Sequence, residues 1–203
     1  MFKMKLVIGF IVYSNKAAKY LPYFLNSLMD QNFDDFKILA LDHSEKKENE
    51  NVKILKQYNI EYEWTGGNLG FARGHNKLIK KAVKLGAEYY MALNVDMILE
   101  PDAVLKMFEA TNNNKGLASV CPKILKWDYV NQIKTNFIDS CGIIEVSALR
   151  FGDLGQGEID RGQWDKANIL GPSGAAALYR IKALEKIKEG DNYFDENMFM
   201  YKE

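Results

Sequence analysis

Short apolar runs alternate with segments of helical periodicity through the first half of the chain. The apolar runs lie at 5–13, 36–41, 59–64 and 89–93. The runs at 5–13 and 89–93 lack a regular apolar-polar alternation, which is typical of strands covered on both faces of a parallel sheet. The helical segments lie at 17–30, 45–58, 71–84 and 101–110. This order predicts an α/β fold with a right-handed, mostly parallel central sheet and flanking helices.

The alternation weakens after the loop at 112–114. One more strand is predicted at 116–125, and the segment 127–168 carries scattered aromatic residues and glycines without a helical period. We expect a small antiparallel region and loops there, covering a site rather than building the sheet. A run of small residues around Gly174 and Ala175 precedes a last apolar segment. Small side chains let a ligand approach the backbone closely.

Composition and charge narrow the function classes. The chain has 203 residues without a linker, 47% of them hydrophobic, so a single domain covering 1–203 is predicted. Its formal net charge of zero provides no general attraction for nucleic acid or an anionic membrane. Cys121 and Cys141 lack metal-ligand spacing and are interpreted as buried free thiols of a reducing compartment. We expect a cytoplasmic protein, with peripheral contact to the inner face of the membrane left open.

Polar residues follow the predicted strands at their carboxyl ends, where open parallel sheets bind ligands. Asn94 and Asp96 follow the strand at 89–93 and are oxygen ligands of the kind that hard divalent cations prefer. Asp42 ends the second strand and could accept a hydrogen bond from a nucleobase imide or a ribose hydroxyl. Tyr13 and Asn15 follow the first strand in the same way. A nucleotide pocket is therefore predicted along this edge.

A glycine-marked loop at 66–70 leads into the third helix, and Arg73 lies one turn further on. The loop would let backbone reach a ligand beside Asn68, and Arg73 could donate charge-assisted hydrogen bonds to a diphosphate. The loop matches neither the phosphate-loop nor the dinucleotide fingerprint. Simpler interpretations remain open: Asp42 and Asp96 could only start turns, and Arg73 could only face solvent.

Four motifs appear in the order expected of one known family. They are Gly67-Asn68-Leu69-Gly70-Phe71-Ala72-Arg73-Gly74-His75-Asn76, Leu93-Asn94-Val95-Asp96 with Pro101-Asp102, Gly174-Ala175-Ala176, and Phe194-Asp195-Glu196 through Tyr201-Lys202-Glu203. On these motifs the chain resembles a family 2 glycosyltransferase of the Rossmann-like GT-A fold, and within that group it is most similar to rhamnosyltransferase-like members. The resemblance covers nearly the whole chain.

The resemblance implies an inverting glycosyltransferase that moves a sugar from a nucleoside-diphosphate sugar, such as a dTDP- or UDP-sugar, to an acceptor hydroxyl. It implies a nucleotide-binding part at about 1–112 and an acceptor-side part at about 113–203. Asn94 and Asp96 would stand at the Asp-x-Asp position that holds Mn2+ or Mg2+, and Gly174 and Ala175 would lie on the acceptor side. A glycan or lipid-linked acceptor, and a role in cell-surface polysaccharide synthesis, would follow.

Two departures from the family pattern matter. Asn94 replaces the first aspartate of the metal motif, which leaves Asp96 as the charged ligand. Glu203 would open the family's Glu-Asp pair, whose second member usually serves as catalytic base and would follow Glu203, so the catalytic end is expected to be incomplete. Two rival functions remain: a sugar-nucleotide-binding module without turnover, and a nucleotidyltransferase. The second lacks support because 13–16 contains no glycine-rich basic loop.

Overall fold

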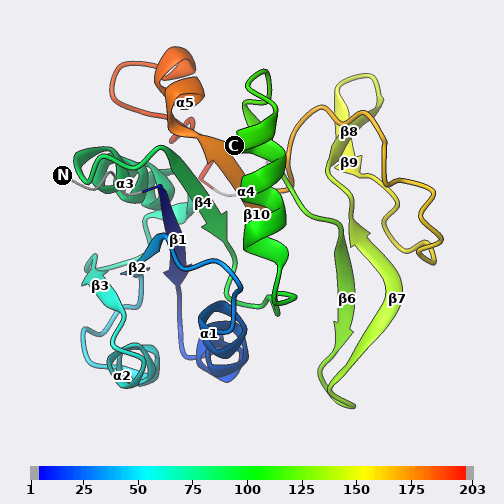
Figure 1. The fold of residues 1–203 in the computed structure, drawn as a ribbon. Helices are drawn as coiled ribbons and strands as arrows, with labels where there is room; N and C mark the ends of the chain where they lie inside the picture. Colours follow the sequence, from blue (N-terminus) through cyan, green and yellow to red (C-terminus); the bar gives the residue numbers. More distant parts are fainter. Residues whose placement is uncertain (1–4, 200–203) are drawn as a thin grey trace.

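A six-stranded sheet has the order β3-β2-β1-β4-β10-β5, with helices on both faces (Figure 1). The structure is a computed structural model that describes residues 5–199. The four strands from β1 to β4 pair in parallel, whereas β10 is antiparallel to both of its neighbours. The strands span Leu6–Val12 (β1), Phe36–Asp42 (β2), Glu61–Trp64 (β3), Tyr89–Leu93 (β4), Ser119–Val120 (β5) and Ala176–Arg180 (β10). The predicted α/β fold with a mostly parallel sheet is confirmed.

Helices cover the sheet in two layers. Their bounds are Ala17–Lys19 (η1, a 3-10 turn), Leu21–Met29 (α1), Glu50–Gln57 (α2), Gly70–Lys84 (α3), Ala103–Asn113 (α4) and Ile181–Ile187 (α5). Side chains of α1, α2 and α4 pack in one core cluster, and those of α3 and α5 pack in another. Because successive residues of β1 point to opposite faces, Leu6 and Ile8 join the first cluster and Val7 joins the second.

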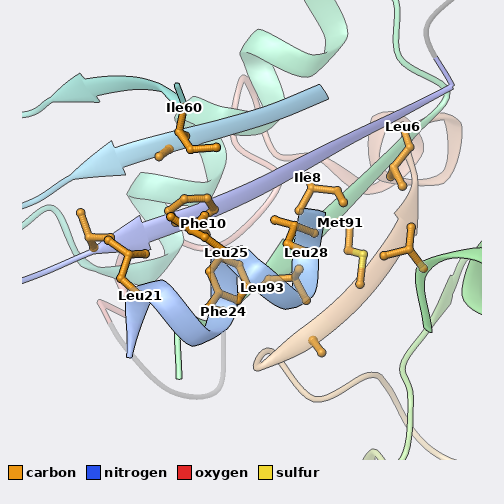
Figure 2. Close-up of a cluster of buried hydrophobic side chains, with 14 of the residues drawn as sticks. Leu6, Ile8, Phe10, Leu21, Phe24, Leu25, Leu28, Ile60, Met91 and Leu93 are labelled. Carbon is orange, nitrogen blue, oxygen red and sulfur yellow. The ribbon is translucent and has the colours of Figure 1, made fainter. Parts of the chain in front are cut away.

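The core between β1 and α1 shows how the sequence pattern becomes packing (Figure 2). The buried positions of α1 are spaced along one helical stripe: Leu21, Phe24, Leu25 and Leu28. Phe24 meets Phe10 of β1 edge to face, with ring centroids 5.1 Å apart. Each such fully buried side chain contributes roughly 1.5–3 kcal/mol, so this cluster fixes the central strands whose ends form the site.

Three predicted elements differ from those observed. The segment at 17–30 is split into η1 and α1, with Pro22 in the first turn of the second helix. The segment from 45 to 58 becomes helical only at Glu50, because the side chain of Asn49 accepts a hydrogen bond from the Val52 amide and caps α2. The strand predicted at 116–125 is two strands, because Pro122 cannot donate a ladder hydrogen bond.

The expected antiparallel region consists of two hairpins. They pair β6 (Ile124–Asp128) with β7 (Ile133–Ser140), and β8 (Ile143–Ser147) with β9 (Arg150–Asp153). Both lie away from the central sheet, with β6 on the side of α4 (Figure 1). Cys121 and Cys141 are free thiols as expected, but both are partly exposed rather than buried. Within residues 5–199, no helix is long and apolar enough to span a bilayer.

Candidate functional site

The structure brings the carboxyl ends of β1, β2 and β4 to one edge of the sheet. Val12, the last residue of β1, is in register with Asp42, and the parallel pairing of β1 with β4 runs to Leu93. The sequence-predicted ligands on these strand ends are Tyr13, Asn15, Asp42, Asn94 and Asp96. Their shared edge is the geometry that a nucleotide pocket in an open parallel sheet requires. Their individual roles stay predictions.

Asp42 is fully buried rather than open to a ligand. Its Oδ1 accepts a hydrogen bond from the backbone amide of Ser44 at 3.0 Å, and its Oδ2 accepts one from Nδ2 of Asn49 at 2.7 Å. The carboxylate therefore holds the turn that leads into α2. Because no part of this side chain is exposed, a base or ribose could reach it only after the turn moves.

Two buried polar side chains beside Asp42 were missed by the sequence analysis. His43 and Asn51 are at most 1% exposed, yet His43 Nε2 and Asn51 Oδ1 have no hydrogen-bond partner among the described residues. Burial lowers the pKa of His43 to about 4, against the opposing effects of Asn68 and Asp42. The neutral ring can donate or accept one more hydrogen bond. The sequence signal that could have indicated His43 is its position directly after β2, where the apolar run gives way to polar residues.

The glycine loop turns into α3 as predicted, but Phe199 covers this turn. Gly70 has a φ of +77°, and a Cβ there would overlap the carbonyl oxygen of Phe199. The Phe71 amide donates to that same oxygen at 2.9 Å. Asn68 is exposed, and its side-chain oxygen accepts from the Gly70 amide at 2.9 Å. The first turn of α3 thus binds residue 199 of the chain.

Residues 193–199, here named the C-terminal strap, are held on α3 by one buried asparagine. Asn76 is 1% exposed, and its Oδ1 accepts from the amides of Tyr193 at 2.9 Å and Phe194 at 2.8 Å. Its Nδ2 donates to the Phe194 carbonyl at 2.9 Å and to Glu196 Oε1 at 3.2 Å. All four bonds of the side-chain amide therefore serve the strap, a role that sequence analysis did not assign to Asn76.

Arg73 and Glu196 form an ion pair across the same contact. Arg73 Nε donates to Glu196 Oε2 at 2.9 Å. The Glu196 side chain is 25% exposed and contacts both Arg73 and Asn76. Arg73 is 58% exposed, and the pair uses one of its five donors. It can therefore still reach an anion at this edge while it holds the strap.

Asn94 and Asp96 are exposed beyond β4. The Asn94 amide donates to the Ala175 carbonyl at 2.9 Å, which places the small residues Gly174 and Ala175 beside the expected metal ligands. Tyr129 of the β6–β7 turn donates its hydroxyl to the Asp96 carbonyl at 2.8 Å and was not foreseen as a site residue. Within residues 5–199, no three His, Cys, Asp or Glu side chains gather as a complete cation site.

The donor set nevertheless fits a hard divalent cation. Mg2+ is commonly bound by one or two carboxylates together with substrate phosphates and water. Asp96 offers one exposed carboxylate and Asn94 one amide oxygen at the same strand end. A nucleoside diphosphate would supply the other oxygens. Glu203, the expected catalytic residue, lies outside the described residues.

Behind the site, a buried hydrogen bond joins the sheet to α3. Nδ1 of His75 lies 2.6 Å from the Tyr90 hydroxyl, and both residues are at most 1% exposed. Burial, with a smaller effect from His43, lowers the pKa of His75 to about 3. A Cβ on Gly9 of β1 would overlap the Tyr90 hydroxyl, so a glycine leaves the space for this pair. The ring is therefore neutral at physiological pH.

A cavity of about 1050 Å³ adjoins the strand end on the α4 side of the sheet. Asn94, Asp96 and Ala175 line it together with residues of α4, β6 and β7. Tyr13, Asp42, Asn68 and Arg73 do not line it. This edge of the sheet therefore carries two regions on either side of Asp96. One is the polar strand ends of β1 and β2, and the other is the cavity beneath α4.

Comparison with known proteins finds one family match and several similar folds. Residues 10–188 match the family described as Glycosyl transferase family 2. No curated protein matches the sequence significantly. Among solved structures, the S. aureus TarS fragment 1–349 in complex with UDP is similar with a TM-score of 0.58 and 21% identity, over 97% of this chain and 52% of that one.

A second similar structure is the mannosyltransferase PcManGT from Pyrobaculum calidifontis in complex with GDP-Man and Mn2+. It has a TM-score of 0.58 and 11% identity, over 92% of this chain and 47% of that one. At such identities the likeness shows the fold alone, and the chain spans only about half of either protein. The family match covers most of the chain, and this chain belongs to glycosyl transferase family 2, with a GT-A fold.

Proposed function

We propose that the chain binds a nucleoside-diphosphate sugar and belongs to an inverting glycosyltransferase that transfers this sugar to an acceptor hydroxyl. The observation that carries the proposal is the convergence of three parallel strand ends on one edge, where Asn94 and Asp96 are exposed. The similar solved structures support it, since they hold UDP, UDP-GlcNAc or GDP-Man.

The residues divide the binding work. His43 and Asn51 carry unpaired polar atoms that are buried at this strand end, so exposed Tyr13 is the side chain there that a base or ribose could contact directly. Arg73 contributes positive charge beside the glycine loop, where a diphosphate can approach the backbone closely. Asp96 and Asn94 would hold Mn2+ or Mg2+, which would neutralise negative charge on the departing diphosphate.

The acceptor side of the proposal has its own support. The Asn94–Ala175 backbone bond sets small residues next to the leaving-group end, which leaves room for an attacking hydroxyl. A carboxylate that removes the hydroxyl proton contributes typically about 10²–10⁴-fold in rate, and Glu203 stands at the motif expected to supply it. Rhamnosyl transfer to a surface polysaccharide at the inner face of the membrane is the specific role we propose.

The test is calorimetric titration of UDP, dTDP and GDP with Mn2+ or with chelator present. We expect at least one nucleotide to bind more tightly with Mn2+, and Asp96→Ala to remove the effect of the metal. Asp34→Ala is the matched control, because this exposed aspartate precedes β2 at the opposite edge of the sheet. Equal affinities with Mn2+ and with chelator in the unmodified chain would contradict the role of Asp96.

A further inference from the structure

The cavity under α4 is partly open to solvent and has the size of a ligand site. Its volume of about 1050 Å³ is at the upper end of the range of roughly 300–1,000 Å³ that small-molecule sites occupy. Protein interiors are packed as densely as organic crystals and hold few voids larger than a water molecule. The volume of this cavity and its position beside the candidate site therefore indicate a ligand site.

The lining of this cavity is mainly apolar and comes from several elements that are far apart in the sequence. Met97 and Leu99 follow β4, Met107 lies on α4, and Ile124 and Trp127 lie on β6. Methionine side chains adapt to irregular apolar ligands because they are unbranched and flexible. A long apolar group would find continuous contact here.

One polar atom in the wall lacks a partner. The indole Nε1 of Trp127 is buried and has no hydrogen-bond partner within residues 5–199. A buried N–H without a partner costs roughly as much as a lost hydrogen bond, so native structures usually satisfy it. Because this atom has almost no exposed area, an oxygen atom on a bound molecule would satisfy the donor once the indole ring turns toward the cavity.

The charged side chains in the lining balance, four lysines (Lys106, Lys123, Lys126 and Lys134) against four carboxylates (Asp96, Glu100, Asp102 and Asp139), so the lining favours neither sign of ligand. Three lysines in its lining are neutralised by carboxylates: Lys106 by Asp102 at 2.6 Å, Lys123 by Asp160 at 2.8 Å, and Lys134 by Glu100 at 2.5 Å. The part of a ligand that enters is therefore apolar and uncharged. Its polar end belongs at Asn94, Asp96 and Ala175, where the cavity meets the strand end.

We propose that this cavity binds the apolar part of the acceptor, a chain or ring system whose hydroxyl-bearing end lies beside Asp96. The inference rests on the proposed function, because it assigns the acceptor class of the same transferase. It selects a lipid-like acceptor over a purely polar glycan. The chain joins the two substrates at Asp96, with the nucleotide on the β1 and β2 side and the apolar group beneath α4.

The probe is octyl β-glucoside below its micelle concentration, with glucose as the control that lacks the chain. We expect calorimetry to show at least tenfold tighter binding of octyl β-glucoside than of glucose. Ala110→Trp places a ring at a cavity-lining position of α4 and should weaken octyl β-glucoside at least tenfold. Glu109→Trp is the matched control, because the neighbouring Glu109 is exposed and does not line the cavity.

A second variant tests the indole donor. Trp127→Phe keeps an aromatic ring and removes the N–H, so octyl β-glucoside should bind severalfold more weakly while the thermal melting temperature stays close to that of the unmodified chain. Octyl β-glucoside binding no tighter than glucose, or equal binding by the Ala110 and Glu109 variants, would overturn the proposal.

Nucleotide titrations on the same samples separate this inference from the proposed function. UDP or dTDP binding should be unchanged in both α4 variants. Nucleotide binding without octyl β-glucoside binding overturns the cavity assignment alone. Octyl β-glucoside binding without any nucleotide binding supports the apolar site and overturns the transferase function.

Discussion

Replacing Asn76 by alanine should detach the C-terminal strap from α3 while leaving the central sheet folded. The side chain of Asn76 makes four hydrogen bonds of 2.8–3.2 Å to residues 193–196. Alanine removes all of them and favours the helix itself, since it has the best intrinsic helix propensity. The effect should therefore concentrate on the strap.

The magnitude follows from these four contacts. A neutral hydrogen bond contributes a net value of about 0.5–1.5 kcal/mol, and a bond to a charged group about 1.5–3 kcal/mol. Three neutral bonds and one to the Glu196 carboxylate sum to roughly 3–7.5 kcal/mol. Since about 1.4 kcal/mol corresponds to a factor of ten, the strap should open at least about 100-fold more often.

Native-state hydrogen exchange of the Tyr193 and Phe194 amides is the direct assay, because both amides donate to Asn76. Asn76→Asp keeps an oxygen acceptor for these amides but removes both donors and puts a carboxylate beside Glu196, so its protection should be intermediate. Asn197→Ala is the control, since the Asn197 side chain bonds only to Asp195 within the strap.

Unchanged protection of both amides in Asn76→Ala would refute the reasoning. Equal loss of protection in Asn197→Ala would show that the strap is held by its own turn rather than by α3. A uniform loss across β1 and β4 would show that Asn76 supports the whole sheet.

Two further predictions concern the buried core behind the site. Gly9→Ala should lower the free energy of unfolding by about 1–3 kcal/mol through overpacking against Tyr90. Gly171→Ala is the control, because a Cβ there meets nothing within 4 Å. Equal melting temperatures of the two variants would contradict this prediction. Acid should also destabilise the fold, because His43 and His75 have pKa values of about 4 and about 3 when folded. Both lie below the value of about 6.5 for an unfolded chain, so the unfolded state binds more protons, and stability is full above that pH and falls below it. At pH 5 the free energy of unfolding should fall by roughly 2 kcal/mol per histidine, which urea unfolding at pH 7.5 and pH 5 measures. His43→Asn should remove about half of this fall. An unchanged pH dependence of stability in that variant would count against the role of His43.

The sequence predicted those parts of the fold that depend on local pattern. The strands at 6–12 and 89–93 are continuous apolar runs, and their order with the helices was sufficient to bring Asp42 and Asp96 to one edge. The break at Pro122 was missed, although the sequence signals it, because proline lacks the N–H that a strand ladder needs.

Other features depend on contacts between residues far apart in the sequence. The Arg73–Glu196 pair spans 123 positions, and no pattern near Arg73 indicates its partner. Asp42 is predicted as a ligand by its place at a strand end, but its burial depends on how the turn at 44–49 folds back over it. Asn76 resembles any polar helix residue until the strap is placed on it.

The position of β10 has a consequence for how the protein is made. This late strand lies between β4 and β5, although α4 and both hairpins separate it from β4 in the chain. During synthesis, the backbone groups on that side of β4 stay unpaired until residues 176–180 emerge and fold back. An apolar strand with an open edge is a template for aggregation, and distant pairings form slowly. The nascent chain therefore exposes an unpaired edge of the fully buried strand β4 until β10 pairs with it, and during that time this edge is open to chaperones or to other chains.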